Sequence, residues 1–340
     1  MSRIKCFYLS LTRIADLEEV PYDVEPVPRG GWETGDYVMG EITQVHSTFA
    51  SLELSTGRHI EGMPGDRAIG ALGKRCATLE GVGSWEDIGD DLAMQSMTAA
   101  GLFGKLTSIS HRSPRPVPLD YVGHVIRGGL TLNMRDFVKP SEPRALATPV
   151  VLLVGTSMSA GKTTTGRVVI HELKKMGLAV VGAKLTGAGR YRDVLSFGDA
   201  GADHILDFVD AGMPSTIADP EEYRTRLRQL LSRISALKAD VLVAEVGASP
   251  MEPYNGAVAI EEIGSQVRCR ILCASDPYAV VGVRTAFGFQ PDLVTGPAAN
   301  TEAGIDLVVK LTGVRALNMM DRSSHDELAS ILRKKLEPAW

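Results

Sequence analysis

One stretch in the middle of the sequence constrains the fold more than any other. Residues 150–154 form an uninterrupted apolar run, a loop of small residues follows, and Gly161-Lys162-Thr163 then opens a segment with the pattern of a helix. An apolar run of this length is typical of a strand buried in a parallel sheet. A buried strand, a glycine-containing loop, and a lysine and threonine at a helix start form the P-loop pattern, in which backbone N–H groups surround phosphates. The sequence therefore predicts a phosphate-binding loop.

The side chains of this loop have separate predicted tasks. Lys162 is expected to bridge the β- and γ-phosphates of a nucleotide, and the Thr163 hydroxyl to bind Mg²⁺. The predicted cofactors are therefore ATP and Mg²⁺. The residues predicted to bind the nucleotide here are Gly155, Thr156, Ser157, Met158, Ser159, Ala160, Gly161, Lys162, Thr163 and Thr164. The alternative, a glycine-rich turn that binds nothing, is disfavoured because strand, lysine, threonine and helix all agree.

Strands and helices alternate through the rest of the C-terminal half. The predicted strands are residues 150–154, 179–183, 240–245 and 270–274, and the predicted helices are 162–176, 220–237, 303–311 and 324–336. Asp219 is placed to cap the helix that starts at residue 220. Such alternation implies a parallel sheet with helices on both faces. We therefore predict an α/β domain of the P-loop NTPase type over residues 150–340.

The chain before this domain has a different pattern. Residues 139–149 contain three prolines and few apolar residues, which predicts a linker. Residues 1–138 contain short alternating segments between glycine-containing turns, and these segments include 37–45, 49–54 and 121–126. This pattern predicts a small β-rich, barrel-like domain of antiparallel strands, with one helix near residues 90–100. A length of 340 residues is also that of two domains.

The phosphate loop resembles those of two enzyme families. From Gly155 to Thr163 it is similar, at the same length, to the Gly-Thr-Asp-x-x-x-Gly-Lys loop of dethiobiotin synthetase and to the loop of the family that includes bacterial D-glutamate N-acetyltransferases. Five residues separate Gly155 from Gly161, one more than in the strict motif. ParA/MinD-type ATPases belong to the same larger class, but they carry a signature lysine where this sequence has Ser157. The resemblance covers about residues 150–320 and favours a small-molecule enzyme over a partitioning switch.

Two further segments extend this resemblance. Lys184, Thr186 and Gly187 follow the second predicted strand, as Lys-Pro-x-x-x-Gly or Thr-Gly segments do in the two families. The resemblance implies a catalytic role for Lys184 and a place beside the substrate for Thr186 and Gly187. Glu245 ends the next apolar strand and is similar to the first residue of the Glu-Gly-x-Gly-Gly and Glu-Gly-Gln-Gly-Ser segments of the two families. Glu245 is thus expected to act in catalysis and to bind Mg²⁺, directly or through water, because a hard cation prefers carboxylate oxygens.

Four other polar residues are candidates for the same site. Asp276 follows the strand at 270–274 and should emerge at the carboxyl edge of the sheet, where open α/β folds bind ligands. Asn300 follows another short strand and is a candidate to hydrogen-bond a purine edge or to cap the helix after it. Arg190 and Arg192 are candidates to hold an anionic substrate, with plain surface charge as the alternative.

Two more groups of polar residues leave their roles open. Asp199, Asp203, His204 and Asp207 are predicted to lie in a helix, where Asp203 and Asp207 share a face that either binds metal or substrate or is solvated. In the first domain, the basic residues are His111, Arg112, Arg115, His124 and Arg127. Their spacing matches no familiar zinc site, so they form either a basic rim that binds substrate or an ordinary barrel surface.

Composition excludes several classes of function. The net charge is −5, so no overall positive field draws the chain to nucleic acid or to an anionic membrane. The four cysteines include no Cys-x-x-Cys pair, and no segment has the pattern of a signal peptide or of a membrane span. The sequence therefore predicts a cytoplasmic protein with no nucleic-acid or membrane partner.

The leading functional hypothesis is an ATP- and Mg²⁺-dependent kinase or ligase for a small, anionic metabolite. A second hypothesis is an N-acyltransferase whose loop binds the phosphates of coenzyme A, as the acetyltransferase resemblance implies. A third is a nucleotide-dependent switch or chaperone ATPase whose β-rich domain binds a protein. Enzymes of the resembling kind often dimerise, so a homodimer or other homo-oligomer is expected.

Overall fold

The computed structural model describes residues 5–45 and 49–337. They divide into two compact units. The first consists of the chain up to Pro140 together with Ala188–Arg192 and Phe208–Ile217, and the second of Ser141–Gly187, Asp193–Asp207 and the chain from Ala218 onward. Two short segments from inside the predicted C-terminal domain therefore group with the β-rich unit, which the sequence pattern did not indicate. No helix among the described residues is both long enough and apolar enough to cross a membrane.

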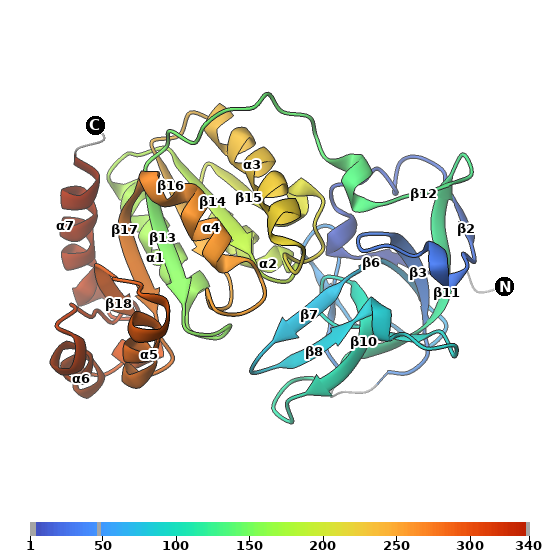
Figure 1. The fold of residues 1–340 in the computed structure, drawn as a ribbon, viewed down its shortest axis with the longest axis horizontal. Coiled ribbons are helices and arrows are strands. Elements are labelled where there is room, and N and C mark those ends of the chain that lie inside the picture. The colour runs from blue at the N-terminus through green and yellow to red at the C-terminus, as the bar shows by residue number, and fades with distance from the viewer. Residues whose placement is uncertain (1–4, 46–48, 338–340) are drawn as a thin grey trace. The chain divides into compact units, whose positions relative to one another are not determined.

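The first unit is built from short strands (Figure 1). They are β1 (Cys6–Tyr8), β2 (Asp23–Glu25), β3 (Tyr37–Ile42), β4 (Leu52–Glu53), β5 (His59–Ile60), β6 (Arg67–Leu72), β7 (Lys74–Ala77), β8 (Gly81–Ser84), β9 (Ala93–Ser96), β10 (Leu102–Ile109), β11 (Val117–Arg127) and β12 (Leu130–Thr131). The pairings β6–β3, β3–β11, β11–β9, β9–β10 and β10–β6 return to their starting strand. A ring of paired strands is a closed barrel, so the predicted barrel-like character is confirmed.

Inward-facing side chains fill this barrel. Val38, Leu72, Phe103 and Leu119 come from four strands of the ring and belong to one buried cluster. The predicted helix near residues 90–100 is wrong. Residues 93–96 form β9 instead, because their backbone pairs on one side with β10 and on the other with β11. Pairing with two neighbours overrides the local helical preference of this segment.

The second unit contains a parallel sheet and seven α-helices among the described residues, and one of these helices is shared with the first unit. The strands are β13 (Val150–Gly155), β14 (Val180–Thr186), β15 (His204–Asp207), β16 (Val241–Val246), β17 (Val267–Cys273) and β18 (Leu293–Thr295). The helices are α1 (Lys162–Lys175), α2 (Tyr191–Asp199), α3 (Pro220–Ala236), α4 (Gly256–Ile263), α5 (Pro277–Phe287), α6 (Glu302–Thr312) and α7 (His325–Leu336). This alternation confirms the predicted α/β class.

The strands lie in the order β15-β14-β16-β13-β17-β18, and every pairing is parallel (Figure 1). All residues of β13, β14 and β16 are buried, as expected for strands covered on both faces. α1 and α7 pack on each other, and α3 packs on α4, so two separate groups of helices cover the sheet. The chain leaves β13 toward β14 on one side and later reaches β17 on the other. This change of direction is the point where open α/β sheets bind ligands.

Candidate functional site

The loop after β13 lies at this point of the sheet. It connects the end of β13 to the start of α1, and β13 lies between β16 and β17. The backbone N–H of Thr156 donates to the carbonyl of Cys273, which ties the start of the loop to β17. Gly161 has φ 91° immediately before α1, a left-handed conformation that favours glycine. The loop therefore delivers the N-terminus of α1 to the carboxyl edge of the sheet, which is a favourable place for an anion.

Gly155 leaves room for the lysine of the loop. A Cβ atom at this position would lie 2.5 Å from Lys162 Nζ and 2.9 Å from the carbonyl oxygen of Ala248. Gly247 is similarly constrained, because a Cβ there would overlap the carbonyl oxygen of Thr186. Both glycines thus permit close approach of the strand ends around Lys162.

Lys162 is buried and bends back onto its own loop. Its Nζ donates to the carbonyl oxygens of Ser157 at 2.7 Å and Met158 at 3.3 Å. Burial lowers the pKa of Lys162, and the neighbouring Glu245 carboxylate acts against this decrease. The ammonium group thus has carbonyl partners from the loop and a carboxylate nearby. An incoming phosphate would be a stronger partner than the carbonyls, because its bond to the ammonium is charge-assisted.

Thr163 and Glu245, the two predicted metal ligands, lie in direct contact. The Thr163 hydroxyl donates to Oε2 of Glu245 at 3.1 Å. Glu245 is in β16 and only 3% exposed. Burial raises its pKa above the ordinary glutamate value, while the ammonium groups of Lys184 and Lys162 oppose the rise.

The chemistry of this pair fits Mg²⁺. A hydroxyl and a carboxylate are hard oxygen ligands, and Mg²⁺ at phosphate-transfer sites takes one or two carboxylates with substrate phosphates and water. Within residues 5–45 and 49–337, no group of three His, Cys, Asp or Glu side chains is arranged to hold a metal by itself. Thr163 and Glu245 would therefore hold the ion together with phosphate oxygens.

Lys184 lies beside the same carboxylate. It is paired in register with Glu245 across β14 and β16, and its side chain is 6% exposed. Its Nζ donates to Oδ2 of Asp193 at 2.5 Å. Burial disfavours the ammonium form, but Asp193 and Glu245 outweigh burial and raise the pKa of Lys184. The second predicted catalytic lysine is thus held positively charged.

Asp193 is a site residue that sequence reasoning missed. It is the third residue of α2, a helix whose start has no Ser, Thr, Asp or Asn at the preceding position. It lies nine positions after Lys184 in the chain, and no short motif joins the two residues. Its place in the first turn of a helix directly after the Lys184 strand was the available signal.

Thr186 and Gly187 have structural contacts. The Thr186 hydroxyl donates to the carbonyl oxygen of Gly247 at 3.1 Å and is fully buried. Gly187 has φ 130°, a conformation that L side chains rarely adopt. The pair fixes the end of β14 against the end of β16. Their predicted contact with substrate stays a prediction.

Asp276 and Asn300 lie in turns at strand ends. Oδ1 of Asp276 accepts the backbone N–H groups of Tyr278 and Ala279, so the side chain caps α5. Thr301 caps α6, so Asn300 does not have that capping role. Ser275 joins Asp276 to the loop, because its backbone N–H donates to the Thr156 hydroxyl at 3.1 Å. These contacts give Asp276 a structural task at the edge of the site.

Arg190 and Arg192, the candidates for holding an anionic substrate, do not lie beside the phosphate loop within the second unit. Arg190 and Arg192 are exposed and belong to the first unit, so they are not among the residues that surround Lys162 within the second unit.

The predicted helix with Asp203 and Asp207 on one face is wrong. Residues 204–207 form β15, which pairs in parallel with β14. Gly201, with φ 102°, lies between the end of α2 and this strand. Asp207 is buried beside Lys184, whereas Asp203 pairs with Lys174 at 2.7 Å.

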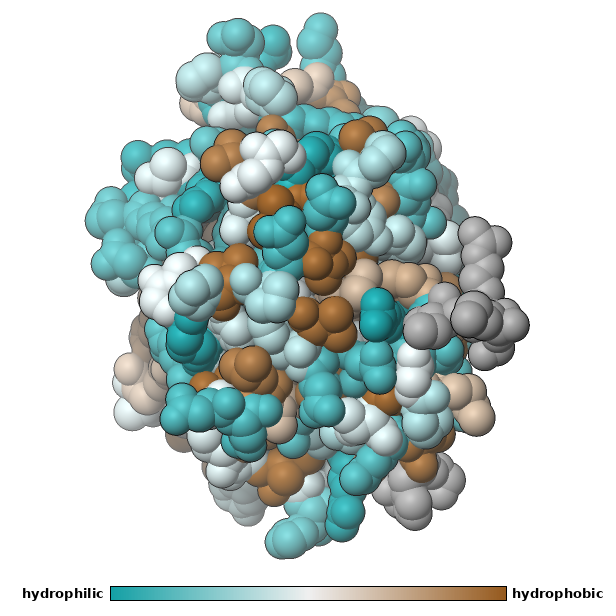
Figure 2. All heavy atoms as spheres, turned by 90° about the vertical axis from the view of Figure 1, so that its right-hand side faces the viewer, coloured by the Kyte–Doolittle hydropathy of each residue, from teal (hydrophilic) through white to brown (hydrophobic). Residues whose placement is uncertain are grey.

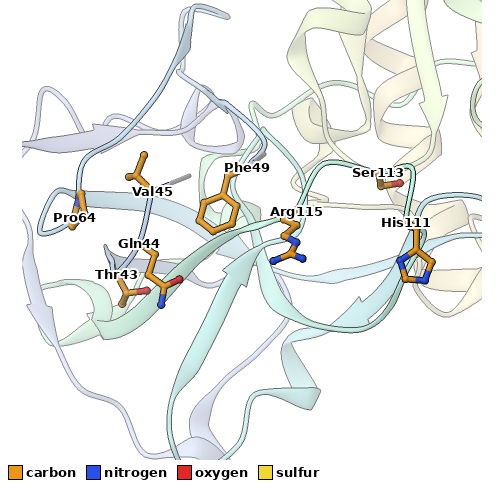
Figure 3. A pocket seen from close by; sticks show the side chains of 8 residues that line it. All are labelled: Thr43, Gln44, Val45, Phe49, Pro64, His111, Ser113 and Arg115. Atoms are coloured by element: carbon orange, nitrogen blue, oxygen red, sulfur yellow. The ribbon is translucent and has the colours of Figure 1, made fainter. Parts of the chain in front are cut away.

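The basic residues of the first unit do not form one rim. His124 is fully buried with its Nδ1 at 2.6 Å from the Tyr121 hydroxyl, and Arg127 bonds Asp16. His111 and Arg115 instead line an open pocket of about 770 Å³ (Figure 3). Its other lining residues are Thr43, Gln44, Val45, Phe49, Pro64 and Ser113. The picture shows the Arg115 side chain next to the Phe49 ring, with His111 below Ser113 in this view.

Comparisons with known proteins found partial similarity to several solved structures. No protein-family profile matches the sequence, and no curated protein sequence matches it. HypB from Helicobacter pylori is similar with 19% identity and a TM-score of 0.37, over 56% of this chain and 88% of that chain. Chloroplast FtsY from Physcomitrella patens has 15% identity and a TM-score of 0.35. The match covers 52% of this chain and 59% of FtsY, so it spans about three fifths of that protein.

A duf1611 family protein from Anabaena variabilis is also similar, with 16% identity, a TM-score of 0.34 and coverage of 61% of this chain and 65% of that chain. None of these three proteins is a dethiobiotin synthetase. The resemblance to that enzyme and to the acetyltransferase family rests on the motifs of this sequence alone.

Proposed function

We propose that this chain is an ATP- and Mg²⁺-dependent enzyme that transfers a phosphoryl group to a small anionic metabolite or activates its carboxyl group as an acyl phosphate. The observation that carries the proposal is the contact between Thr163 and Glu245 beside the loop lysine. A hydroxyl, a buried carboxylate and two buried lysines at one sheet edge suit a nucleotide polyphosphate with its metal.

Each group has a task in this proposal. The loop N–H groups and the Lys162 ammonium bind the β- and γ-phosphates, and Thr163 and Glu245 hold the metal against them. Bound Mg²⁺ supplies charge neutralisation at the phosphate oxygens. Lys184, kept charged by Asp193, faces the carboxylate of Glu245 and adds a second positive charge to the site. Phosphoryl transfer depends mainly on such positioning and charge stabilisation.

We propose an anionic substrate because the charged Lys184 offers a favourable partner for a carboxylate or phosphate. The choice of ATP over GTP is part of the proposal, and no structural feature here distinguishes the two bases.

The test measures nucleoside diphosphate release with ATP and with GTP, across a panel of small carboxylic and phosphorylated acids. Hydroxylamine is added in parallel, because it traps an acyl phosphate as a hydroxamate and so separates a ligase from a kinase. Release that depends on one acid and disappears in Lys162→Ala supports the proposal. Release that persists in Lys162→Ala contradicts it. Thermal stabilisation by acetyl-CoA but not by Mg²⁺-nucleotide would favour the acyltransferase instead.

A further inference from the structure

The pocket of the first unit has no part in the proposed function. Its volume of about 770 Å³ is within the range of about 300–1,000 Å³ that is usual for small-molecule sites. All of its lining residues belong to the first unit. In the view of Figure 3, the apolar side chains of Val45, Phe49 and Pro64 lie on one side of Arg115, and His111 lies on the other. The pocket thus combines an apolar wall with a positive charge.

The charge of Arg115 is not neutralised by a neighbouring acid. Within the described part of the chain, neither Arg115 nor His111 has an ion pair or a side-chain hydrogen bond. Residues 43–50 and 110–118, which supply all of the lining except Pro64, contain no Asp or Glu. An anion that enters the pocket would therefore meet a guanidinium that no described carboxylate occupies.

The backbone around Arg115 is held in place. Arg115 lies between Pro114 and Pro116, and a residue that precedes proline is restricted to an extended conformation. Its carbonyl oxygen accepts the backbone N–H of Ala50 at 2.8 Å. The same pairing forms a parallel bridge between Phe49 and Arg115. Because the backbone positions of the guanidinium and the aromatic ring are fixed beside each other, less freedom is lost when a ligand binds to both.

Hydrogen bonds also hold the two polar walls of the pocket. The backbone N–H of Thr43 donates to the carbonyl oxygen of Pro118 at 3.2 Å, which ties the segment after β3 to β11. The Ser113 hydroxyl donates to the carbonyl oxygen of Glu80 at 3.3 Å. The carboxylate of Glu80 pairs with Arg75, so this acid already has a cation as its partner.

We propose that this pocket binds a small organic anion whose carboxylate or phosphate lies on Arg115 and whose apolar part lies against Phe49. A guanidinium presents its N–H donors in a planar fork that matches carboxylate and phosphate oxygens. An aromatic ring covers apolar surface of the ligand. Gln44 and Ser113 offer hydrogen-bonding groups to other polar atoms of the ligand. The inference does not rest on the proposed function, because the phosphate loop belongs to the second unit.

The experiment titrates the full chain, without nucleotide, with benzoate, phenyl phosphate and benzamide. The two anions carry a carboxylate or a phosphate on an apolar ring, and benzamide is a neutral analogue of benzoate. The readout is NMR of ¹³C-methyl-labelled valine, in which the Val45 signal, assigned with Val45→Ala, reports binding in this pocket. We expect saturable shifts with a dissociation constant of about 1–10 mM for the tighter anion, and binding of benzamide at least about tenfold weaker. The tighter of the two anions distinguishes a carboxylate site from a phosphate site.

Variants test the two contacts separately. Arg115→Gln removes the guanidinium, and Arg112→Gln is its matched control, because it changes the charge equally at an exposed residue that does not line the pocket. We expect Arg115→Gln to weaken binding of the tighter anion about tenfold or more, and Arg112→Gln to weaken it less than about twofold. Phe49→Leu keeps an apolar side chain without the ring and should weaken binding about two- to fivefold.

Three results would overturn the inference. They are a Val45 signal that neither anion shifts, benzamide binding as tight as that of the tighter anion, and equal affinity in Arg115→Gln and the wild type. Arg115 is exposed, so its replacement should leave the fold intact, which circular dichroism verifies. Because no nucleotide is present, the outcome is independent of whether the phosphate loop binds one.

Discussion

The Thr163 hydroxyl donates a hydrogen bond of 3.1 Å to the carboxylate of Glu245, which joins the first turn of α1 to β16. These residues are 82 positions apart in the chain, yet their oxygens are close enough to bind one metal ion. The positive charges of Lys162 and Lys184 both favour the ionised form of the buried carboxylate by opposing the rise of its pKa. The phosphate loop after β13 thus contacts Glu245 in β16, which the sequence motifs also indicated as a site residue.

The metal dependence of activity should follow from this pair. We expect Glu245→Gln to raise the Mg²⁺ concentration needed for half-maximal activity on the order of 10- to 100-fold, because an amide oxygen is a weaker ligand than a carboxylate. Thr163→Ala should act in the same direction, whereas Thr163→Ser keeps the hydroxyl and serves as the matched control. Activity is measured against Mg²⁺ at fixed nucleotide. Equal Mg²⁺ requirements in Glu245→Gln and the wild type would remove Glu245 from the metal site.

Nucleotide affinity should depend on pH through Lys162. Burial lowers its pKa, so its ammonium is lost at a lower pH than that of an exposed lysine. The charged form attracts phosphate. Affinity is therefore constant below the lowered pKa and decreases as pH rises through it, and binding is accompanied by proton uptake in that range.

Calorimetry of Mg²⁺-nucleotide between about pH 7.5 and about pH 10 measures this dependence, since the phosphates are fully ionised there while an ordinary lysine is still charged. Lys162→Arg retains its charge throughout and should bind with a flatter pH profile, although with altered affinity. An affinity that does not change with pH in the wild type would show that the Lys162 charge does not contribute.

The position of α2 on the sheet should depend on Phe197. This fully buried ring packs on two glycines, because a Cβ would lie 2.9 Å from its Cδ2 atom at Gly182 of β14 and 2.5 Å from its Cε1 atom at Gly166 of α1. We expect Phe197→Ala to lower the free energy of unfolding of the second unit by about 3–5 kcal/mol. Phe197→Leu fills more of the space and should cost less.

The measurement is denaturant unfolding followed by circular dichroism at the helix band, since the α-helices described lie in the second unit apart from the first two residues of α2. A loss below about 1 kcal/mol in Phe197→Ala would mean that the ring is not a main contact of α2.

Much of the second unit could be predicted because its signals are local. The apolar run at 150–154 became β13, and Asp219 caps α3 by accepting from Glu221 and Glu222, as its place before Pro220 indicated. In both cases neighbouring residues alone determine the structure. The loop lysine and threonine were found for the same reason, because the P-loop pattern is contiguous in sequence.

The errors and omissions arise where distant contacts decide. Residues 93–96 look helical in isolation, and only their pairing with β10 and β11 makes them a strand. Asp193 and Glu53 carry no motif, since their partners lie at Lys184 and at the start of α2. The local sequence pattern shows which residues are able to cap a helix or form a pair. It does not show which residues from distant parts of the chain become their partners.

The described surface carries several exposed hydrophobic side chains. Figure 2 shows one face of the molecule, on which hydrophobic residues occur in several groups with hydrophilic residues between them. The most exposed large hydrophobic residues of the first unit are Leu130, Met63 and Leu79, which are far apart in the sequence. Exposed single hydrophobic side chains of this kind are usual for a protein surface. The predicted homodimer therefore stays a prediction.

The most direct test of the central claim is calorimetric titration of the wild type and of Lys162→Ala with Mg²⁺-ADP and with non-hydrolysable Mg²⁺-ATP and Mg²⁺-GTP analogues. Circular dichroism confirms that the variant is folded. The account predicts saturable binding of one nucleotide by each wild-type chain, and a loss of affinity of about 100-fold or more in Lys162→Ala, because a buried charge-assisted contact to phosphate is removed. Equal affinity in the variant, or binding of none of these nucleotides by the wild type, would contradict the assignment of the loop after β13 as the nucleotide site.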